Sequence, residues 1–129
     1  MPYAASLGKP AIGLQQETIS HQAMSDKTVI LINVFTVRPE RQQELIELLT
    51  RATEESVRHA PGFMSARLHR SLDGTKVTMY AQWRSNADYQ AMRKDPAPLP
   101  YLTRALEIAT FEQGMYEVVQ SFSAFSADA

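Results

Sequence analysis

Hydrophobic side chains fill both the odd and the even positions of VILINVFTV, the segment from Val29 to Val37. Many of these residues are β-branched, which favours a strand, and a strand with one exposed face would alternate more regularly. We therefore expect a strand whose two faces are both covered. Residues 1–27 before it are mixed and polar without periodicity, and glycine and proline interrupt them, so they are expected to form an arm or extension.

Helical spacing begins at Pro39, a residue that suits the first turn of a helix. Within PERQQELIELLTRATEESVRHA, apolar or small side chains recur at three- and four-residue intervals and share one face: Leu45, Leu48, Leu49, Ala52 and Ser56. Charged side chains fall mostly elsewhere, as they do on a solvated helix face. Pro61-Gly62 is expected to end this helix.

The next two segments predict a β-hairpin. In FMSARLHRS, alternation places one set of side chains on one face: Phe63, Ser65, Arg67 and His69. In KVTMYAQW, the set that shares a face is Val77, Met79, Ala81 and Trp83. The dipeptide Asp73-Gly74 between the two segments is a strong signal for a two-residue turn, so the strands are expected to pair antiparallel.

The C-terminal part of the chain predicts a divided helical region and a last strand. Ser85 and Asp88 match the S-x-x-D capping box, so a short helix that carries Tyr89 and Met92 is expected there. The proline-rich segment DPAPLP ends it. A second helical stretch follows, with apolar side chains near one side at Tyr101, Leu102, Ala105, Leu106 and Ala109. Gly114 is interpreted as a break, MYEVVQSFSAF (115–125) as the last strand, and residues 126–129 as a frayed tail.

The resulting order, β-α-β-β-α-β over residues 28–125, is that of an α+β fold of the ferredoxin-like split βαβ type with a four-stranded antiparallel sheet. Its helices would cover one face of the sheet and leave an apolar second face. Such a face tends to find a partner. A symmetric homodimer that packs sheet on sheet is the simplest arrangement.

Composition narrows the function classes. The chain has 129 residues, which suggests one domain, and its net charge of −1 without a basic run argues against a nucleic-acid partner. The absence of cysteine excludes disulfides and fits a cytoplasmic location. No apolar run approaches the roughly 20 residues of a membrane span, and the N-terminal segment does not resemble a secretory signal. The three histidines, His21, His59 and His69, lack metal-ligand spacing, so no metal is expected.

Three segments carry more specific information: INVFTVRPE, HAPGFMSARLHRSLDGTKVTMYAQWRS and ATFEQGMYEVV. Together they resemble the antibiotic biosynthesis monooxygenase family of dimeric α+β barrels, over about Lys27 to Phe125. The resemblance implies a homodimer and a monooxygenase that oxidises an aromatic phenol, anthrone or quinol with O2 and without a cofactor.

Other members of the same superfamily isomerise small metabolites, degrade haem or lack an assigned activity. The haem-degrading members need a histidine on the helical segment after the third strand, and residues 99–110 contain none. The alternatives to an oxygenase are therefore an isomerase-type enzyme and a non-catalytic ligand-binding dimer.

The resemblance also implies three catalytic residues, Trp83, Tyr89 and Arg104. Trp83 would line the site and donate its indole N–H to a substrate oxygen, while Tyr89 would bind that oxygen or relay a proton. Arg104 would stabilise a phenolate or an enolate. The alternative interpretations are a core tryptophan, a tyrosine that packs its ring on the sheet, and a solvated helix charge.

Met79 departs from the family pattern. Similar oxygenases carry an asparagine just before Tyr-Ala-Gln-Trp, and methionine cannot replace its hydrogen-bond donor. The polar role would then pass to Asn33, His69 or Gln82. We therefore expect the substrate-binding set to consist of Met79, Asn33, His69 and Met92, with a surface strand position as the alternative for His69.

Overall fold

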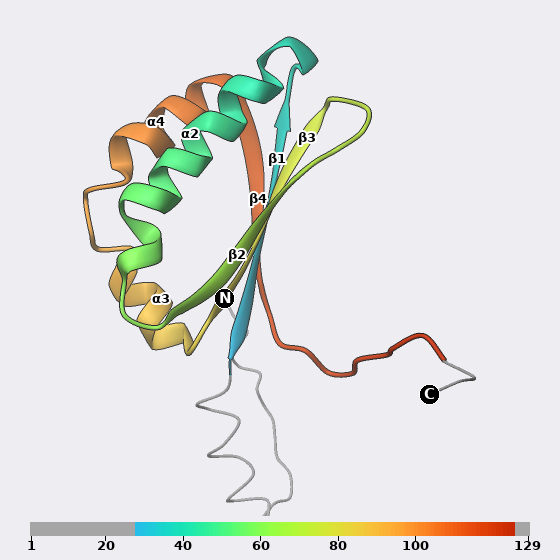
Figure 1. Cartoon of the computed structure of the whole chain (residues 1–129). Helices are drawn as coiled ribbons and strands as arrows, with labels where there is room; N and C mark the ends of the chain where they lie inside the picture. Colours follow the sequence, from blue (N-terminus) through green and yellow to red (C-terminus); the bar gives the residue numbers. More distant parts are fainter. Residues whose placement is uncertain (1–27, 126–129) are drawn as a thin grey trace, which may run out of the picture.

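The computed structural model describes residues 28–125, and the expected arm (1–27) and tail (126–129) lie outside this part. The elements are, in chain order, β1 (Val29–Val37), η2 (Pro39–Arg41), α2 (Gln42–Glu55), η3 (Val57–His59), β2 (Phe63–Arg70), β3 (Lys76–Trp83), α3 (Asn86–Met92), α4 (Leu99–Ile108) and β4 (Ala109–Tyr116). The strands form one antiparallel sheet in the order β2-β3-β1-β4. Helices α2, α3 and α4 all lie on one face of it (Figure 1). The ferredoxin-like α+β prediction is thus confirmed.

Strand β1 lies inside the sheet, because it pairs with β3 on one side and with β4 on the other. Its side chains alternate between the faces, and Leu31 and Phe35 are buried on the helix side. Asn33 faces the same side, opposite Met79 of β3 and Gln113 of β4. Three neighbouring strands therefore bring three side chains together under the helices, as the Met79–Asn33–Gln113 row.

Helix α2 buries the face that its spacing predicts. Leu45, Leu49 and Ala52 are at most 3% exposed. Leu45 and Leu49 belong to a core cluster that also contains Phe35 and Val77 from the sheet. Burying a side chain of this size stabilises the fold by roughly 1.5–3 kcal/mol, so this cluster holds the helix layer against the sheet.

Gln42, the first residue of α2, is a buried polar side chain with partners. Its Nε2 donates to the carbonyl oxygens of Ser71 and Lys76, at 3.3 and 3.0 Å. Both carbonyls belong to the end of the hairpin between β2 and β3. The amide therefore ties the start of the helix to the hairpin.

The hairpin itself is confirmed, but its loop is wider than the expected two residues. Backbone hydrogen bonds run from Ser71 N to Lys76 O and from Gly74 N to Ser71 O, so residues 72–75 form the loop. Gly74 has φ +85°, in the left-handed region that favours glycine. The Asp73 carboxylate accepts hydrogen bonds from Thr75 Oγ1, Thr75 N and Ser71 Oγ, which lower the pKa of Asp73 to about 2.

The position of the last strand was predicted wrongly. Strand β4 spans Ala109–Tyr116, whereas the predicted strand of residues 115–125 overlaps it only at its end. Ala109 begins this strand, although its apolar spacing had placed it in the helical stretch. Gly114 lies within the strand and does not break it. A Cβ at Gly114 would come within 2.5 Å of the ring of Tyr116, so the glycine leaves room for that ring.

A β-bulge between Phe63 and Ser65 corrects the predicted faces of β2. Phe63 lies opposite Trp83 and packs against it on the helix side. Beyond the bulge, Ser65 and His69 pair with residues of β3 that face away from the helices. The prediction that Phe63 and His69 share a face was wrong, because strict alternation does not continue through a bulge.

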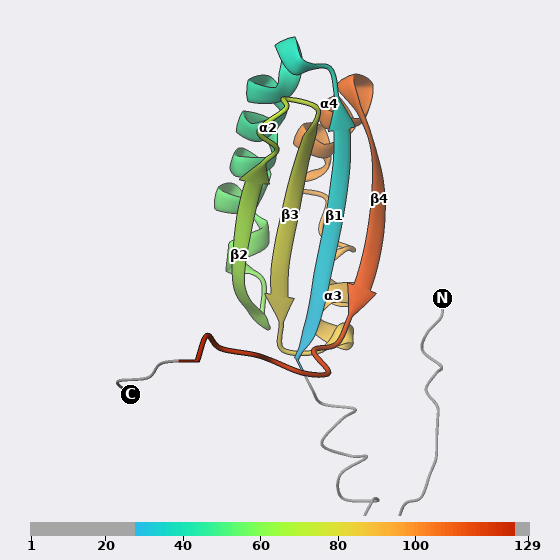
Figure 2. The same cartoon turned by 90° about the vertical axis from the view of Figure 1, so that its right-hand side faces the viewer.

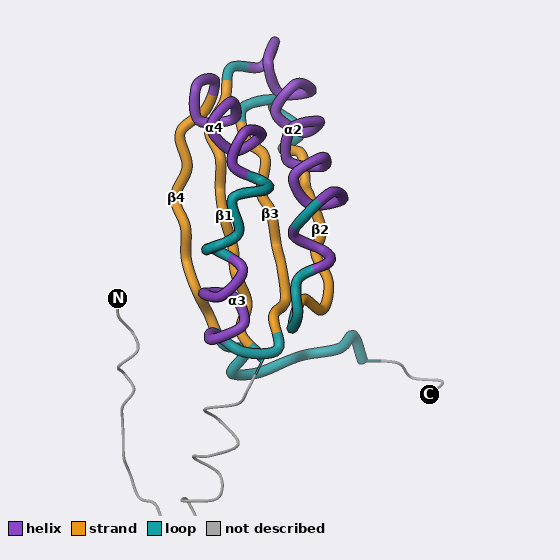
Figure 3. The backbone as a smooth tube through the Cα atoms, turned by 90° about the vertical axis from the view of Figure 1, so that its left-hand side faces the viewer, coloured by secondary structure: helices purple, strands orange, loops and turns teal. Residues whose placement is uncertain are grey.

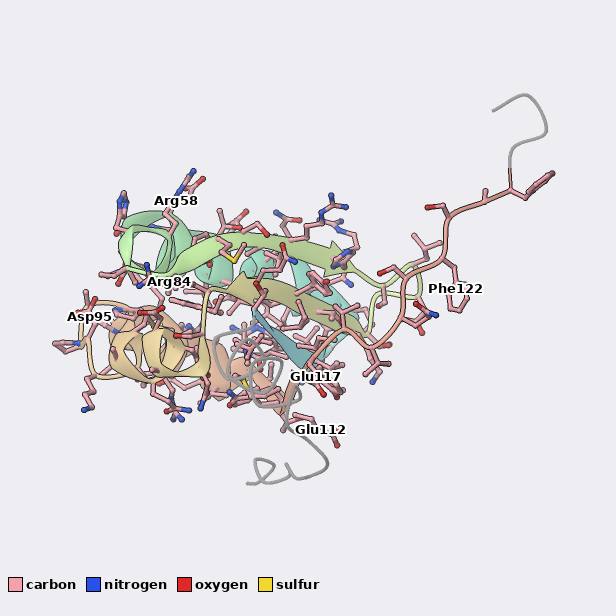
Figure 4. All side chains as sticks on the ribbon, turned by 90° about the horizontal axis from the view of Figure 1, so that it is seen from below. Arg58, Arg84, Asp95, Glu112, Glu117 and Phe122 are labelled. Atoms are coloured by element: carbon pink, nitrogen blue, oxygen red, sulfur yellow. The ribbon has the colours of Figure 1, made fainter. Side chains whose placement is uncertain are left out.

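The other face of the sheet carries no helix (Figure 2). Ile32 and Val34 of β1 lie there, half-buried. Residues 117–125 follow β4 without regular secondary structure and lead away from the sheet, with Phe122 on this segment (Figure 4). Phe122 and Phe125 are 88% and 93% exposed. The face without helices therefore carries apolar side chains of β1 beside polar side chains of β2 and β3, and an exposed apolar segment follows β4.

None of the helices between residues 28 and 125 is both long and apolar enough to span a membrane.

Candidate functional site

A cavity of about 330 Å³ lies between the sheet and the helices. All four strands contribute to one wall, and α2, α3 and α4 form the other (Figure 3, seen from the helix side). The lining is mainly apolar with a few polar groups, which is typical of a small-molecule site. A more open hollow of about 390 Å³ lies beside η3 and α3, and neither Trp83, Asn33 nor Tyr89 lines it.

Trp83 is fully buried and also lines the cavity. Its ring meets Phe63 and Tyr89 edge-on, with ring centroids 5.4 and 5.7 Å apart. The indole Nε1 has no hydrogen-bond partner within residues 28–125. A buried tryptophan N–H usually finds a partner, so this donor is available to an acceptor atom of a ligand. Trp83 is therefore both a core residue and a wall of the cavity.

Asn33 supplies a second unpartnered atom. Its side chain lines the cavity, and its Oδ1 is buried without a donor from the described part of the chain. Met79, opposite it on β3, cannot donate a hydrogen bond. An unpaired buried acceptor costs about 1–3 kcal/mol, and a ligand hydroxyl that reached Oδ1 would remove that cost.

Tyr89 reaches from Trp83 to the Met79–Asn33–Gln113 row. Its ring contacts Trp83, while its Oη accepts a hydrogen bond of 2.5 Å from Gln113 Nε2. Burial raises the pKa of Tyr89, and the charge of Arg93 and the Gln113 hydrogen bond act in the opposite direction. At neutral pH the side chain is therefore a neutral phenol with a proton to donate.

The local sequence fixes the position of Tyr89. Ser85 caps α3 as predicted, because its Oγ accepts the Asp88 N–H at 3.1 Å. Arg84 Nε lies 2.7 Å from the Asp88 carboxylate and lowers the pKa of Asp88. Gly62, in the turn before β2, has φ +87°, and a Cβ there would lie 2.4 Å from Asp88 Cβ. The first turn of α3 thus lies directly against this turn.

Two of the expected site residues do not line the cavity. Arg104 is held by Glu44 at 2.8 Å and by Glu107 at 2.9 Å, so its guanidinium already has two carboxylate partners. His69 is exposed on the face without helices, and its Nδ1 lies 3.4 Å from the carbonyl oxygen of Thr78. The structure therefore does not bring Arg104 or His69 to Trp83.

Gln82 also lies on the face without helices, where it accepts a hydrogen bond from Ser65 Oγ at 2.9 Å. Of the three residues to which the polar role could pass, only Asn33 lines the cavity. Met79 and Met92 line it as expected.

Arg93 and Gln113 are among the lining residues that the sequence analysis did not identify. Arg93 follows Tyr89 by four residues, and this spacing on one helix face could have indicated it. Gln113 was missed because its strand was placed too late in the chain. Within residues 28–125, no group of three or more potential metal-ligating side chains comes together.

Comparison with known proteins gives a consistent set of relatives. Residues 28–98 match the family model described as antibiotic biosynthesis monooxygenase. The chain is 45% identical over 98 residues to tetracenomycin-F1 monooxygenase from Streptomyces glaucescens. The aligned region covers 76% of this chain and 88% of that protein.

The solved structures that are similar to the chain include two oxygenases. One is the monooxygenase ActVA-Orf6 of Streptomyces coelicolor in complex with nanaomycin D, with a TM-score of 0.68, 27% identity and coverage of 78% of this chain and 95% of that one. The other is SnoaB, described as a cofactor-independent oxygenase from Streptomyces nogalater. Its TM-score is 0.67 at 25% identity, covering 76% of this chain and 99% of that one.

Proposed function

The chain belongs to the antibiotic biosynthesis monooxygenase family, and from this we propose that it is a cofactor-independent monooxygenase that oxidises an aromatic phenol, anthrone or quinol with O2. The observation that carries the proposal is the pair of unpartnered polar atoms, Trp83 Nε1 and Asn33 Oδ1, in a mainly apolar cavity. A donor and an acceptor together suit an aromatic ligand that bears both a carbonyl and a hydroxyl group. The names of two relatives, a tetracenomycin-F1 monooxygenase and a cofactor-independent oxygenase, support the reaction class.

An anthrone illustrates why such chemistry demands little of the protein. After loss of a proton, the carbanion passes one electron to O2, and the two radicals combine and are protonated to a hydroperoxide. Loss of water then leaves a carbonyl, so one oxygen atom enters the product, the other leaves as water, and the CH2 group becomes C=O. The protein has to bind the anion, hold it next to O2 and exclude bulk water.

The cavity residues can be given roles on this basis. The Trp83 N–H and the Tyr89 O–H donate to the substrate oxygen on which negative charge develops, and Asn33 Oδ1 accepts from a substrate hydroxyl. We assign the stabilisation of the anion, expected of Arg104, to Arg93, because Arg93 lines the cavity and its charge acts on Tyr89. Met79 and Met92 would pack against the substrate rings.

Oxygen consumption with a panel of anthrones and hydroquinones tests this function. We expect uptake with at least one anthrone, with formation of the quinone. Trp83→Phe should lower kcat/KM by about 10- to 100-fold, because it removes a hydrogen bond to a charged oxygen and keeps an aromatic ring in place. Gln43→Met, on the exposed side of α2 and outside the cavity, is the matched control and should leave the rate unchanged.

Absence of uptake across the whole panel would overturn the oxygenase function. If the same compounds nevertheless quench the fluorescence of Trp83, the non-catalytic ligand-binding function takes its place. Turnover of an enolisable substrate without oxygen consumption would instead favour the isomerase-type alternative.

We also propose that two subunits pair through the sheet faces without helices. This face carries Ile32 and Val34, and the segment after β4 carries exposed Phe122 and Phe125, so a second copy would cover apolar surface on both. Sedimentation should give about twice the mass of one chain, and Val34→Lys should give the single-chain mass. Leu72→Lys, in the exposed hairpin loop, is the control that should remain dimeric. A monomeric native chain would contradict this arrangement.

A further inference from the structure

The hydrogen bond between Gln113 and Tyr89 has a direction. The amide Nε2 of Gln113 donates, and the phenol oxygen of Tyr89 accepts. A phenol has one proton, which this contact does not use. Within residues 28–125, no side chain or carbonyl oxygen accepts that proton. The Tyr89 O–H therefore remains a free donor in the wall of the cavity.

We propose that Gln113 is a positioning residue that keeps the Tyr89 hydroxyl oriented as a donor toward a carbonyl oxygen of the bound aromatic ligand. By occupying an acceptor site of the phenol oxygen, the amide prevents the hydroxyl from turning its proton toward β4. The inference rests on the proposed function only in taking the cavity as the ligand site.

The sheet register explains why Gln113 can fill this role. Gln113 lies opposite Asn33 on the neighbouring strand, so the amide that orients Tyr89 and the unpartnered Asn33 Oδ1 are adjacent. Tyr89 comes from the helix layer and meets Gln113 from the opposite wall, with its ring against Trp83. A carbonyl-bearing ligand would then meet two donors, from Trp83 and Tyr89, and one acceptor, from Asn33. This pattern distinguishes ketones and quinones with a neighbouring hydroxyl from plain hydrocarbons.

Ultraviolet titration of Tyr89 without any ligand tests the positioning role directly. The ionisation of Tyr89 is isolated as the difference between each protein and the same protein with Tyr89→Phe. Gln113→Met has a similar length and no polar group, so it should raise the pKa of Tyr89, because the phenolate loses a donor. Gln113→Glu should raise it further, because a carboxylate accepts the proton and repels the phenolate.

Two charged groups that also line the cavity, Arg93 and Asp95, are the same in all these proteins, so their influence cancels in the comparison. Gln82→Met, in the neighbouring strand β3 on the other face, should leave the pKa of Tyr89 unchanged. An unchanged or lowered pKa of Tyr89 in Gln113→Met would overturn the proposal.

Ligand binding at pH 7 provides a second test that does not need alkaline conditions. The probe is 1,4-naphthoquinone, followed through the fluorescence of Trp83, the single tryptophan of a chain that has no cysteine thiol for a quinone to modify. We expect Gln113→Met to bind about 3- to 10-fold more weakly, the loss of one oriented hydrogen bond. Gln113→Glu should bind more weakly still, because its carboxylate takes the Tyr89 proton. Affinity for naphthalene, which lacks oxygen, should be the same in all three proteins.

Tighter quinone binding by Gln113→Glu than by Gln113→Met would overturn the proposal, because quinone binding would then not depend on a Tyr89 proton that is directed toward the ligand. Failure of the native chain to bind the quinone is a different result. It counts against the ligand class of the proposed function, while the titration of Tyr89 still decides the role of Gln113.

Discussion

Two amide side chains between the helix layer and the sheet differ in their hydrogen-bond partners. Gln42, at the hairpin end of the sheet, donates to the carbonyl oxygens of Ser71 and Lys76. Asn33, in the cavity, leaves its buried Oδ1 without a partner in the described chain. The first amide has its partners within the folded structure, whereas the second keeps an acceptor atom that is available to a ligand. The difference shows that the pairing of a buried polar atom indicates a functional site better than its residue type does.

The largest effect on stability is expected at Trp83, because its side chain belongs to both the core and the cavity. Trp83→Ala should lower the free energy of unfolding by about 3–5 kcal/mol, because it empties a fully buried site. Trp83→Phe should cost clearly less, since the indole N–H has no partner to lose. Urea denaturation measures both values. Equal losses in the two variants would mean that the N–H stabilises the fold and is not free for a ligand.

The next effect contrasts the two amides directly. Gln42→Leu should lower the free energy of unfolding by about 1–3 kcal/mol, because it removes two hydrogen bonds between the start of α2 and the hairpin carbonyls. Asn33→Leu should leave stability unchanged or raise it, and it should weaken the binding of hydroxyl-bearing ligands. Thermal denaturation and quenching of Trp83 provide the two measurements. A similar loss of stability in both variants would remove the distinction between them.

A smaller effect on kcat/KM is expected to distinguish Arg93 from Arg104. Arg93→Gln should reduce kcat/KM about 10-fold, the loss of a charged interaction with the substrate anion, and it should raise the pKa of Tyr89. Arg104→Gln should leave kcat/KM within about twofold, because the Arg104 guanidinium is bound to Glu44 and Glu107. Steady-state oxygen uptake decides between them. The reverse order would return the anion-stabilising role to Arg104.

The smallest effect lies at the hairpin and depends on pH. The folded state lowers the pKa of Asp73 to about 2 from an ordinary 3.8. The ionised carboxylate therefore stabilises the fold when the pH is above the ordinary pKa. This contribution is lost as the pH falls through about 2. Asp73→Asn should therefore lower the melting temperature at pH 5, and the difference from the native chain should vanish near pH 2. A difference that persists at pH 2 would assign it to something other than the carboxylate.

Most of the fold could be predicted from the spacing of apolar residues, because a helix or strand that packs against one layer buries residues at regular intervals. The spacing of Leu45, Leu49 and Ala52 predicts the buried face of α2, and all three are buried. The β-bulge after Phe63 could not be predicted, since an extra residue in a strand leaves no pattern of its own. The position of β4 was missed because a glycine in this pattern was interpreted as a break. Gly114 lies within the strand and leaves room for the ring of Tyr116.

The cavity could be predicted only in part. Trp83, Tyr89 and Met79 follow from the family resemblance together with strand alternation, and all three line the cavity. Asn33 was one of three residues to which the polar role could pass, and its selection over His69 and Gln82 required the strand register, which is a tertiary property. The position of Arg104 outside the cavity could not be predicted, because a resemblance indicates an arginine near this point of the chain but not its partners, Glu44 and Glu107.

Gly62 has no chemistry of its own, yet it determines how deep the cavity is. A side chain there would meet Asp88 at 2.4 Å, so every other residue would push α3 outward, in addition to the strain of φ +87°. Tyr89 would move with α3, away from Trp83 and Gln113. A substitution at Gly62 would conserve every cavity residue and could still change which ligands fit, because it would displace the helix that carries Tyr89.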